Sequence, residues 1–128
     1  MSYNIARVVN PSFALCSFSS SGAGNVTFSF LEGDFTPTIN TTTITLDSGF
    51  EYFLSSAPCV NAGDTAGSYR HIIDGVDGTL YPIQETSSTG GLDQQFFSTL
   101  ADADVSFQLY ADSLIVSNSR LEIWRFPL

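Results

Sequence analysis

The stretch Arg120-Leu-Glu-Ile-Trp-Arg-Phe126 has side chains that alternate in character along its length. In a β-strand, successive side chains point to opposite faces of the sheet. One face of this stretch is then aliphatic with an arginine near its end, and the other is aromatic with one acid. The first set is Leu121, Ile123 and Arg125, and the second is Glu122, Trp124 and Phe126. The pattern predicts a strand in which at least one face is both apolar and charged.

Working outward, the same alternation recurs along the chain. Val26, Phe28 and Phe30 alternate with threonine and serine, and residues 105–110 repeat the pattern. No window shows apolar residues at the three- and four-residue spacing typical of a helix. Runs rich in β-branched and aromatic residues therefore indicate strands throughout. The predicted strands are 5–9, 12–18, 25–31, 41–46, 50–55, 68–74, 79–84, 96–100, 105–110, 114–116 and 120–126, of which some short ones should merge or vanish.

Clusters of glycine, serine, asparagine, aspartate and proline separate these strands. Asp77-Gly78 lies between two of the runs and predicts a tight hairpin, because glycine adopts positive φ without strain. Longer loops are expected at 19–24, 33–40, 57–67 and 85–95. Many short strands at this spacing indicate an all-β fold, an antiparallel jelly-roll β-sandwich, in a single domain spanning residues 1–128.

Charge excludes some classes of partner. The chain has 128 residues, thirteen acids, four arginines and no lysine, for a formal net charge of −9. Binding to nucleic acid or to an anionic membrane relies on many cations that neutralise phosphates, so we expect neither partner. No apolar run approaches the roughly 18 residues needed to cross a bilayer. The first residues also lack the pattern of a secretory signal peptide, and we expect synthesis in a host cytoplasm.

Residues that could support catalysis or bind a metal are few and scattered. His71 is the only histidine, and no Gly-x-Ser-x-Gly motif accompanies it. Asp74 and Asp77 are better explained as turn formers than as a catalytic or calcium-binding pair. Cys16 and Cys59 are expected to be buried, reduced thiols, with a disulfide as the alternative. We therefore expect no enzyme, no cofactor and no metal site.

Aromatic residues are unusually common. Eleven phenylalanines, five tyrosines and one tryptophan make up 13% of the chain. A single sandwich of this length should be unable to conceal all of these rings, and large leftover apolar patches usually become subunit interfaces. A carbohydrate-binding platform is the competing use of the same rings. The residues expected at an oligomer interface are Tyr52, Phe96, Phe97, Trp124 and Phe126.

Four stretches together resemble a known family. Residues 43–54 resemble the opening strand, 68–78 the mid-domain hairpin, 101–110 the segment before the last loop and 119–126 the final strand of the tumour-necrosis-factor-like jelly rolls found in bacteriophage fibre and capsid-surface proteins. The resemblance covers about residues 43–126, so the earlier strands would be needed to complete two sheets. It implies a homotrimer that packs aromatic rings around a threefold axis, and it implies no catalytic residues.

The resulting hypothesis is a virion structural protein, a capsid decoration or head-fibre protein on the outer surface of a phage particle. Its partners would be copies of itself, as a homotrimer, and the major capsid protein or another virion protein. Residues 1–24 could then serve as an attachment or strand-exchange segment. The alternative is a receptor- or carbohydrate-binding module at the tip of a tail fibre, with its ligand held by loops such as 57–67 or 85–95.

Overall fold

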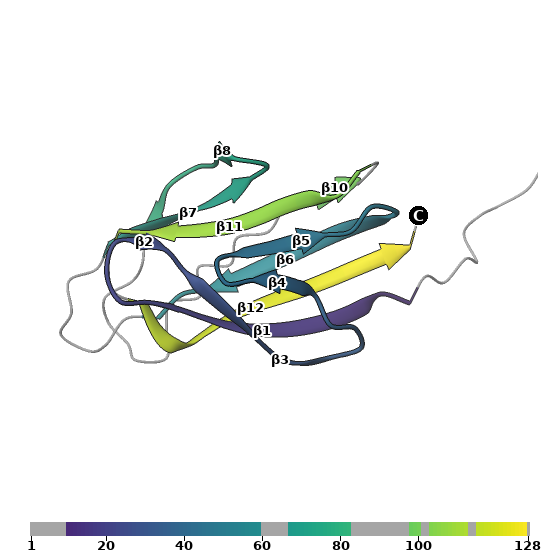
Figure 1. Cartoon of the computed structure of the whole chain (residues 1–128), viewed down its shortest axis with the longest axis horizontal. Helices are drawn as coiled ribbons and strands as arrows, with labels where there is room; N and C mark the ends of the chain where they lie inside the picture. Colours follow the sequence, from purple (N-terminus) through teal and green to yellow (C-terminus); the bar gives the residue numbers. More distant parts are fainter. Residues whose placement is uncertain (1–9, 60–66, 83–97, 101–102, 113–114, 128) are drawn as a thin grey trace, which may run out of the picture.

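The computed structural model describes residues 10–59, 67–82, 98–100, 103–112 and 115–127 (Figure 1). The described residues form strands and turns but no helix, so they include no helical segment able to span a membrane. The strands are β1 (Ser12–Ser20), β2 (Gly24–Asn25), β3 (Thr27–Gly33), β4 (Thr38–Asn40), β5 (Thr43–Leu46), β6 (Phe50–Ala57), β7 (Ser68–Ile73), β8 (Val76–Asp77), β9 (Tyr81–Pro82), β10 (Ser98–Leu100), β11 (Val105–Ala111) and β12 (Ile115–Pro127).

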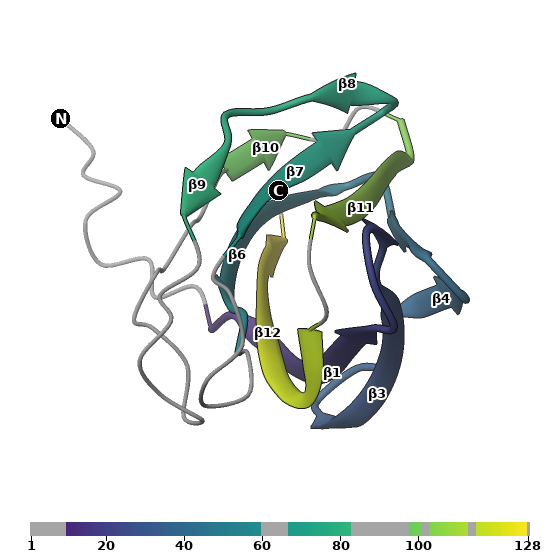
Figure 2. The ribbon, with the colours of Figure 1, turned by 90° about the vertical axis from the view of Figure 1, so that its left-hand side faces the viewer.

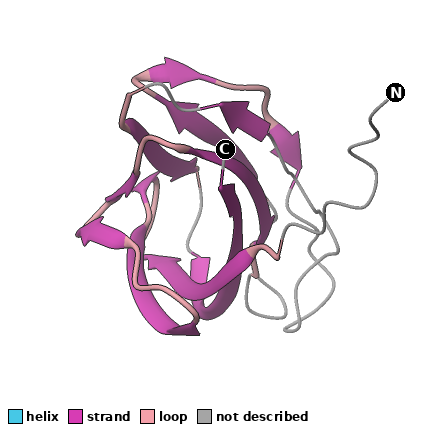
Figure 3. Cartoon of the chain, turned by 90° about the vertical axis from the view of Figure 1, so that its right-hand side faces the viewer, coloured by secondary structure: helices cyan, strands magenta, loops and turns pink. Residues whose placement is uncertain are grey.

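The strands form two antiparallel sheets that pack face to face (Figures 2 and 3). The five-stranded sheet has the order β10-β6-β12-β1-β3. The seven-stranded sheet has the order β4-β5-β11-β7-β8, with β2 also paired to β11 and β9 to β7. This arrangement confirms the predicted all-β, antiparallel jelly-roll sandwich.

β12 is the central strand of the five-stranded sheet and pairs with β1 on one side and β6 on the other. Residues 115–116 of the predicted strand 114–116 and the whole predicted strand 120–126 are parts of this one strand, and residue 114 lies outside the described residues. Its inward side chains Leu121 and Ile123 have no exposed surface and pack in the core between the sheets. Arg125 lies opposite the buried Tyr52 and so belongs to the same inner face. The predicted face that combines apolar and charged groups is therefore the inner one.

The tight hairpin is not where the sequence predicted it. Ile73 pairs with Val76, so the two-residue turn is Asp74-Gly75 and not Asp77-Gly78. Asp74 and Gly75 have φ values of 50° and 77°, as a primed hairpin turn requires. The chain contains two Asp-Gly pairs, and the second one continues the ladder beyond the turn. There the amide of Gly78 donates to the carbonyl of His71 at 2.8 Å.

The first part of the chain contributes an integral strand. β1 lies between β12 and β3, and its inward residues Ala14, Cys16 and Phe18 are buried in the core. Residues 12–20 of the proposed segment are therefore an integral part of the sandwich. Residues 1–9 of that segment lie outside the described residues, as does the predicted strand 5–9.

Gly33, at the end of β3, lies where β3 comes very close to the backbone of β1. A Cβ on this glycine would collide with the carbonyl oxygen of Phe13 and lie 2.6 Å from the Cα of Ala14, so Gly33→Ala must displace backbone. We expect a loss of about 1–3 kcal/mol in the free energy of unfolding, measured by urea denaturation, as for other overpacked sites. Gly22→Ala is the control, because nothing lies within 4 Å of the added Cβ there. Equal stability of the two variants would contradict this account of the packing.

Candidate functional site

A row of aromatic rings crosses the outer face of the five-stranded sheet. The register places Phe13 of β1 opposite Trp124 of β12, and Trp124 opposite Phe53 of β6. The rings of Phe13 and Trp124 are in contact, with centroids 4.5 Å apart. Phe53 is 38% exposed although its neighbours in the chain are buried or half-buried. Three strands therefore present one continuous apolar strip on a face turned away from the core.

Polar groups border this aromatic row. The indole N–H of Trp124 donates to the carboxylate of Glu122 at 3.3 Å, which fixes the orientation of the indole ring on the surface. Glu122 lies opposite Leu15 of β1, so an acid and an aliphatic side chain alternate with the rings. An apolar centre with charged groups at its edge is the usual composition of a protein–protein contact.

The outer face of the seven-stranded sheet has the opposite character. Its outward positions on β5 and β11 are mainly hydroxyl and amide side chains. Tyr110 of β11 is an aromatic exception, and the Arg70 guanidinium lies 5.2 Å from its ring centroid. The hydroxyl and amide positions along β5 and β11 are Thr43, Thr45, Ser106 and Gln108. The two outer faces therefore differ in what they can bind, and the apolar one lies on the five-stranded sheet.

The predicted interface residues have different positions in the structure. Trp124 and Phe126 lie on the outer face of β12 and are half-buried. Tyr52 is only 1% exposed, and its hydroxyl donates to the carbonyl of Asp47 at 3.0 Å, so its ring is not available to another chain. Phe96 and Phe97 lie outside the described residues.

Sequence reasoning omitted two rings of the row, Phe13 and Phe53. Neighbouring residues in a strand face opposite ways, so the Tyr52-Phe53 pair had to send one ring inward and one outward. The alternation shows that one of the two rings faces inward and the other outward, but it does not show which ring faces which way. Phe13 could have been found in the same way, since it alternates with the buried Ala14.

The only histidine lies inside the sandwich. His71 on β7 and Ser56 on β6 meet across the two sheets, with the Nε2 and Oγ atoms 3.1 Å apart. This is the distance of a nucleophile–base pair, but Ser56 is 0% exposed and His71 is 7% exposed. A substrate cannot reach the serine hydroxyl in this conformation, so the pair acts as a contact between the sheets. Burial lowers the pKa of His71 to about 4.

Both cysteines are free and buried, so the structure contains the reduced thiols that the sequence favoured. Burial raises the pKa of Cys16 to about 11 and also raises that of Cys59. Thiols with raised pKa values are poor nucleophiles and poor metal ligands at neutral pH. Among the described residues, no three histidine, cysteine or acidic side chains gather in a way that could hold a metal ion.

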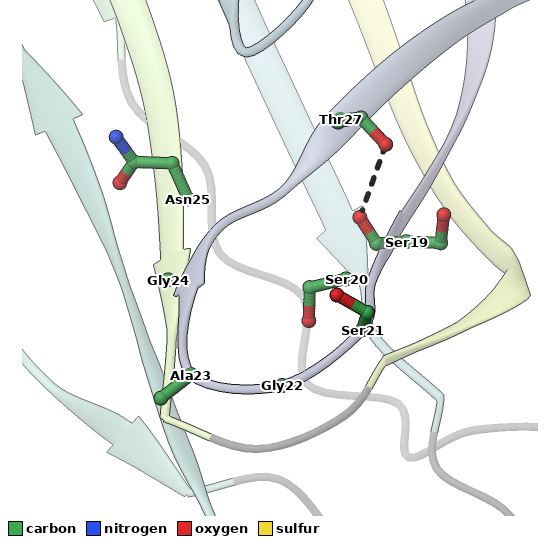
Figure 4. Close-up of a pocket in the computed structure, with 8 residues that line it drawn as sticks. All are labelled: Ser19, Ser20, Ser21, Gly22, Ala23, Gly24, Asn25 and Thr27. Atoms are coloured by element: carbon green, nitrogen blue, oxygen red, sulfur yellow. Dashed lines mark hydrogen bonds between the residues drawn. The ribbon is translucent and has the colours of Figure 1, made fainter.

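A small polar hollow lies where the chain passes from β1 through β2 into β3 (Figure 4). Its volume is about 280 Å³, and serine hydroxyls line it together with Asn25 and Thr27. The hydroxyl of Thr27 donates to the carbonyl of Ser19 at 3.3 Å and ties the two limbs of the loop together. The hollow offers neutral hydrogen-bonding groups and no charged side chain.

Arg125 occupies the end of the inner face. Its guanidinium carbon lies 3.8 Å from the ring centroid of Phe35 and 4.2 Å from that of Phe50. One of its nitrogens lies 3.8 Å from the carboxylate of Asp47. Phe35, which the sequence placed in an ordinary loop, therefore packs against the core through this arginine. Burial raises the pKa of Tyr52 nearby, and the hydrogen bond and charge of Arg125 partly offset that rise.

This stacking can be measured as a coupling energy. In a double-mutant cycle of Arg125→Met with Phe35→Leu, we expect a coupling of about 1 kcal/mol in the free energy of unfolding, because partly desolvated cation–π contacts have that strength. Arg125→Met with Tyr110→Leu is the control cycle, since Tyr110 lies on the outer face of the other sheet. Coupling in both cycles, or in neither, would show that the stacking contributes nothing specific.

The comparisons with known proteins bear on the fold alone. No protein-family model and no curated protein matches the chain. Among solved structures, it is similar to the crystal structure of murine APRIL, a tumour-necrosis-factor-family jelly roll. The TM-score is 0.57 and the sequence identity 11%, over 93% of this chain and 100% of the other. The chain thus has a tumour-necrosis-factor-like jelly-roll fold.

Proposed function

We propose that this protein is a self-associating structural component of a virus particle, a homotrimer that decorates the outer surface of a phage capsid or forms a head fibre. The observation that carries the proposal is the row Phe13–Trp124–Phe53 on the outer face of the five-stranded sheet. This face carries a contiguous apolar strip, whereas the outer face of the seven-stranded sheet is mainly polar. Such a strip favours burial against another protein surface. The tumour-necrosis-factor-like fold supports a trimeric arrangement.

The charge of the chain supports a place on the outside of a particle. With a net charge of −9, the protein would be repelled both by packaged nucleic acid and by an anionic membrane. The role proposed is non-catalytic, since the serine–histidine pair is enclosed in the core. The protein would be made in the host cytoplasm and bind to the major capsid protein or another virion protein there.

Sedimentation of the purified protein tests self-association. At micromolar concentration we expect the wild-type chain to sediment as a trimer and Trp124→Ala or Phe53→Ala to shift it toward monomer. Central aromatic residues of an interface typically contribute about 2 kcal/mol, so each substitution should weaken association roughly 30-fold.

Tyr110→Ala is the matched control, because it removes a half-buried ring from the outer face of the other sheet. It should leave the sedimentation coefficient unchanged. A wild-type protein that is strictly monomeric would overturn the proposed trimer. If Tyr110→Ala dissociated the trimer as strongly as Trp124→Ala, the interface could not be assigned to the outer face of the five-stranded sheet.

Binding to particles tests the location. Purified protein should co-sediment at a fixed stoichiometry with genome-emptied capsids of the virus that encodes it. Saturation at a multiple of three copies per site on the capsid lattice would support decoration. Binding to tail structures alone would contradict it.

A carbohydrate-binding or receptor-binding tip module is the second candidate, and the hydroxyl-lined hollow between β1 and β3 favours it. Neutral hydroxyl and amide groups suit an uncharged sugar better than an anionic one. Glycan-array binding by the wild-type chain that is lost in Ser21→Tyr, a substitution at the exposed rim, would favour this candidate over decoration. We expect no such binding if the protein is a decoration protein only.

A further inference from the structure

The contact between His71 and Ser56 is a polar link between two sheets whose described core is mainly apolar. His71 belongs to β7 of the seven-stranded sheet and Ser56 to β6 of the five-stranded sheet. A neutral imidazole with its proton on Nδ1 can accept a hydrogen bond at Nε2 from the serine hydroxyl. The 3.1 Å contact is compatible with this neutral ring, and the low exposure of both residues favours it.

The surroundings of the ring are mainly aromatic. β11 contributes Phe107, whose ring centroid lies 5.3 Å away, and β7 itself contributes Tyr69 at 6.2 Å. β6 contributes the hydroxyl of Ser56. The one titratable group among these three is the phenol of Tyr69. A proton added to the imidazole would thus place a positive charge beside these two aromatic rings and the serine hydroxyl.

We propose that His71 and Ser56 form an acid-sensitive latch, which holds the two sheets together while the imidazole is neutral and loosens this end of the sandwich when it is protonated. After protonation Nε2 no longer accepts a hydrogen bond. The serine oxygen can still accept one from the imidazolium, but the charge remains inside the core. Burying a charge costs far more than one neutral hydrogen bond returns, so the sheets should separate locally and admit water. This regulation by pH is independent of the proposed self-association.

The pH range follows from the two states of the histidine. Burial lowers the pKa of folded His71 to about 4, against an ordinary value of 6.5. The unfolded chain therefore binds a proton between these values while the folded chain does not. The contribution of His71 to the free energy of unfolding is therefore fully present above about pH 6.5 and is lost as the pH falls toward 4. Between pH 7 and pH 5 the unfolding equilibrium constant should rise about 20-fold from this residue alone.

Urea unfolding of the full chain between pH 5 and pH 7.5 tests the latch. Between pH 7 and pH 5, the unfolding equilibrium constant of the wild type should rise about 20-fold more than that of His71→Gln or His71→Phe. Both variants keep the same thirteen acids, so the carboxylates contribute equally in all three proteins. Ser56→Ala is the matched control, because it removes the link but keeps the titrating ring. It should be less stable at pH 7 and lose less of its stability between pH 7.5 and pH 5 than the wild type, because no hydrogen bond to Nε2 remains for protonation to break. Identical pH profiles for wild type and both His71 variants would overturn the proposal.

A second measurement stays decisive if the His71 variants fail to fold. Because the chain has one histidine, its imidazole gives a single set of NMR resonances. In the folded wild-type protein these resonances should keep the chemical shifts of a neutral ring from pH 7 down to pH 5. A transition centred near pH 6.5 in the folded protein would show that the ring titrates as if exposed, and the latch would be excluded.

Discussion

The pairing of β12 with β1 and β6 is the constraint on which the rest of the structure depends. Every residue from Arg120 to Phe126 has a partner on β6, and most have one on β1 as well. The inward positions then fill the core, and the outward ones align Phe13, Trp124 and Phe53 in one row. A slip of one residue in either pairing would turn the rings inward and the aliphatic side chains outward. The core and the proposed interface therefore depend on one register.

The difference between the two outer faces gives this register a functional meaning. A sheet whose outer face only meets water is satisfied by threonine, serine and glutamine, as along β5 and β11. The outer face of the five-stranded sheet instead holds three aromatic rings in line, where polar residues would serve solubility better. The fold has room for such residues, so their absence from this row is not imposed by the sandwich. Burial against another surface is the physical condition under which such a row becomes favourable.

Local patterns predicted the strands, the sandwich and the buried thiols, because alternation and turn chemistry act within a few residues. What they could not supply was the pairing between distant segments. Two Asp-Gly pairs were equally good turn formers, and only the pairing of Ile73 with Val76 selects the first. Tyr52 and Phe53 could not be assigned to inner and outer faces until β6 had partners. The contact between Ser56 and His71, and the stacking of Phe35 on Arg125, likewise join segments that no local rule relates.

Along the inner face of the sandwich, polar residues lie near the two ends and apolar residues fill the middle. This arrangement helps to specify the register of the strands. Along β6 the inward residues are Tyr52, Leu54 and Ser56, and they face Arg125, Ile123 and Leu121 of β12. Apolar packing dominates the middle and supplies cohesion, but it tolerates a shift of two residues, because aliphatic side chains can replace one another. Arg125 has its ring partners and Asp47 at one end, and Ser56 has His71 near the other. A two-residue shift would separate the buried Ser56 from His71 and Arg125 from its ring partners, and a buried polar group left without a partner costs about 1–3 kcal/mol. The polar groups near the ends of the core thus fix the register that the apolar middle alone would leave open, and that register places the aromatic row on the outer face.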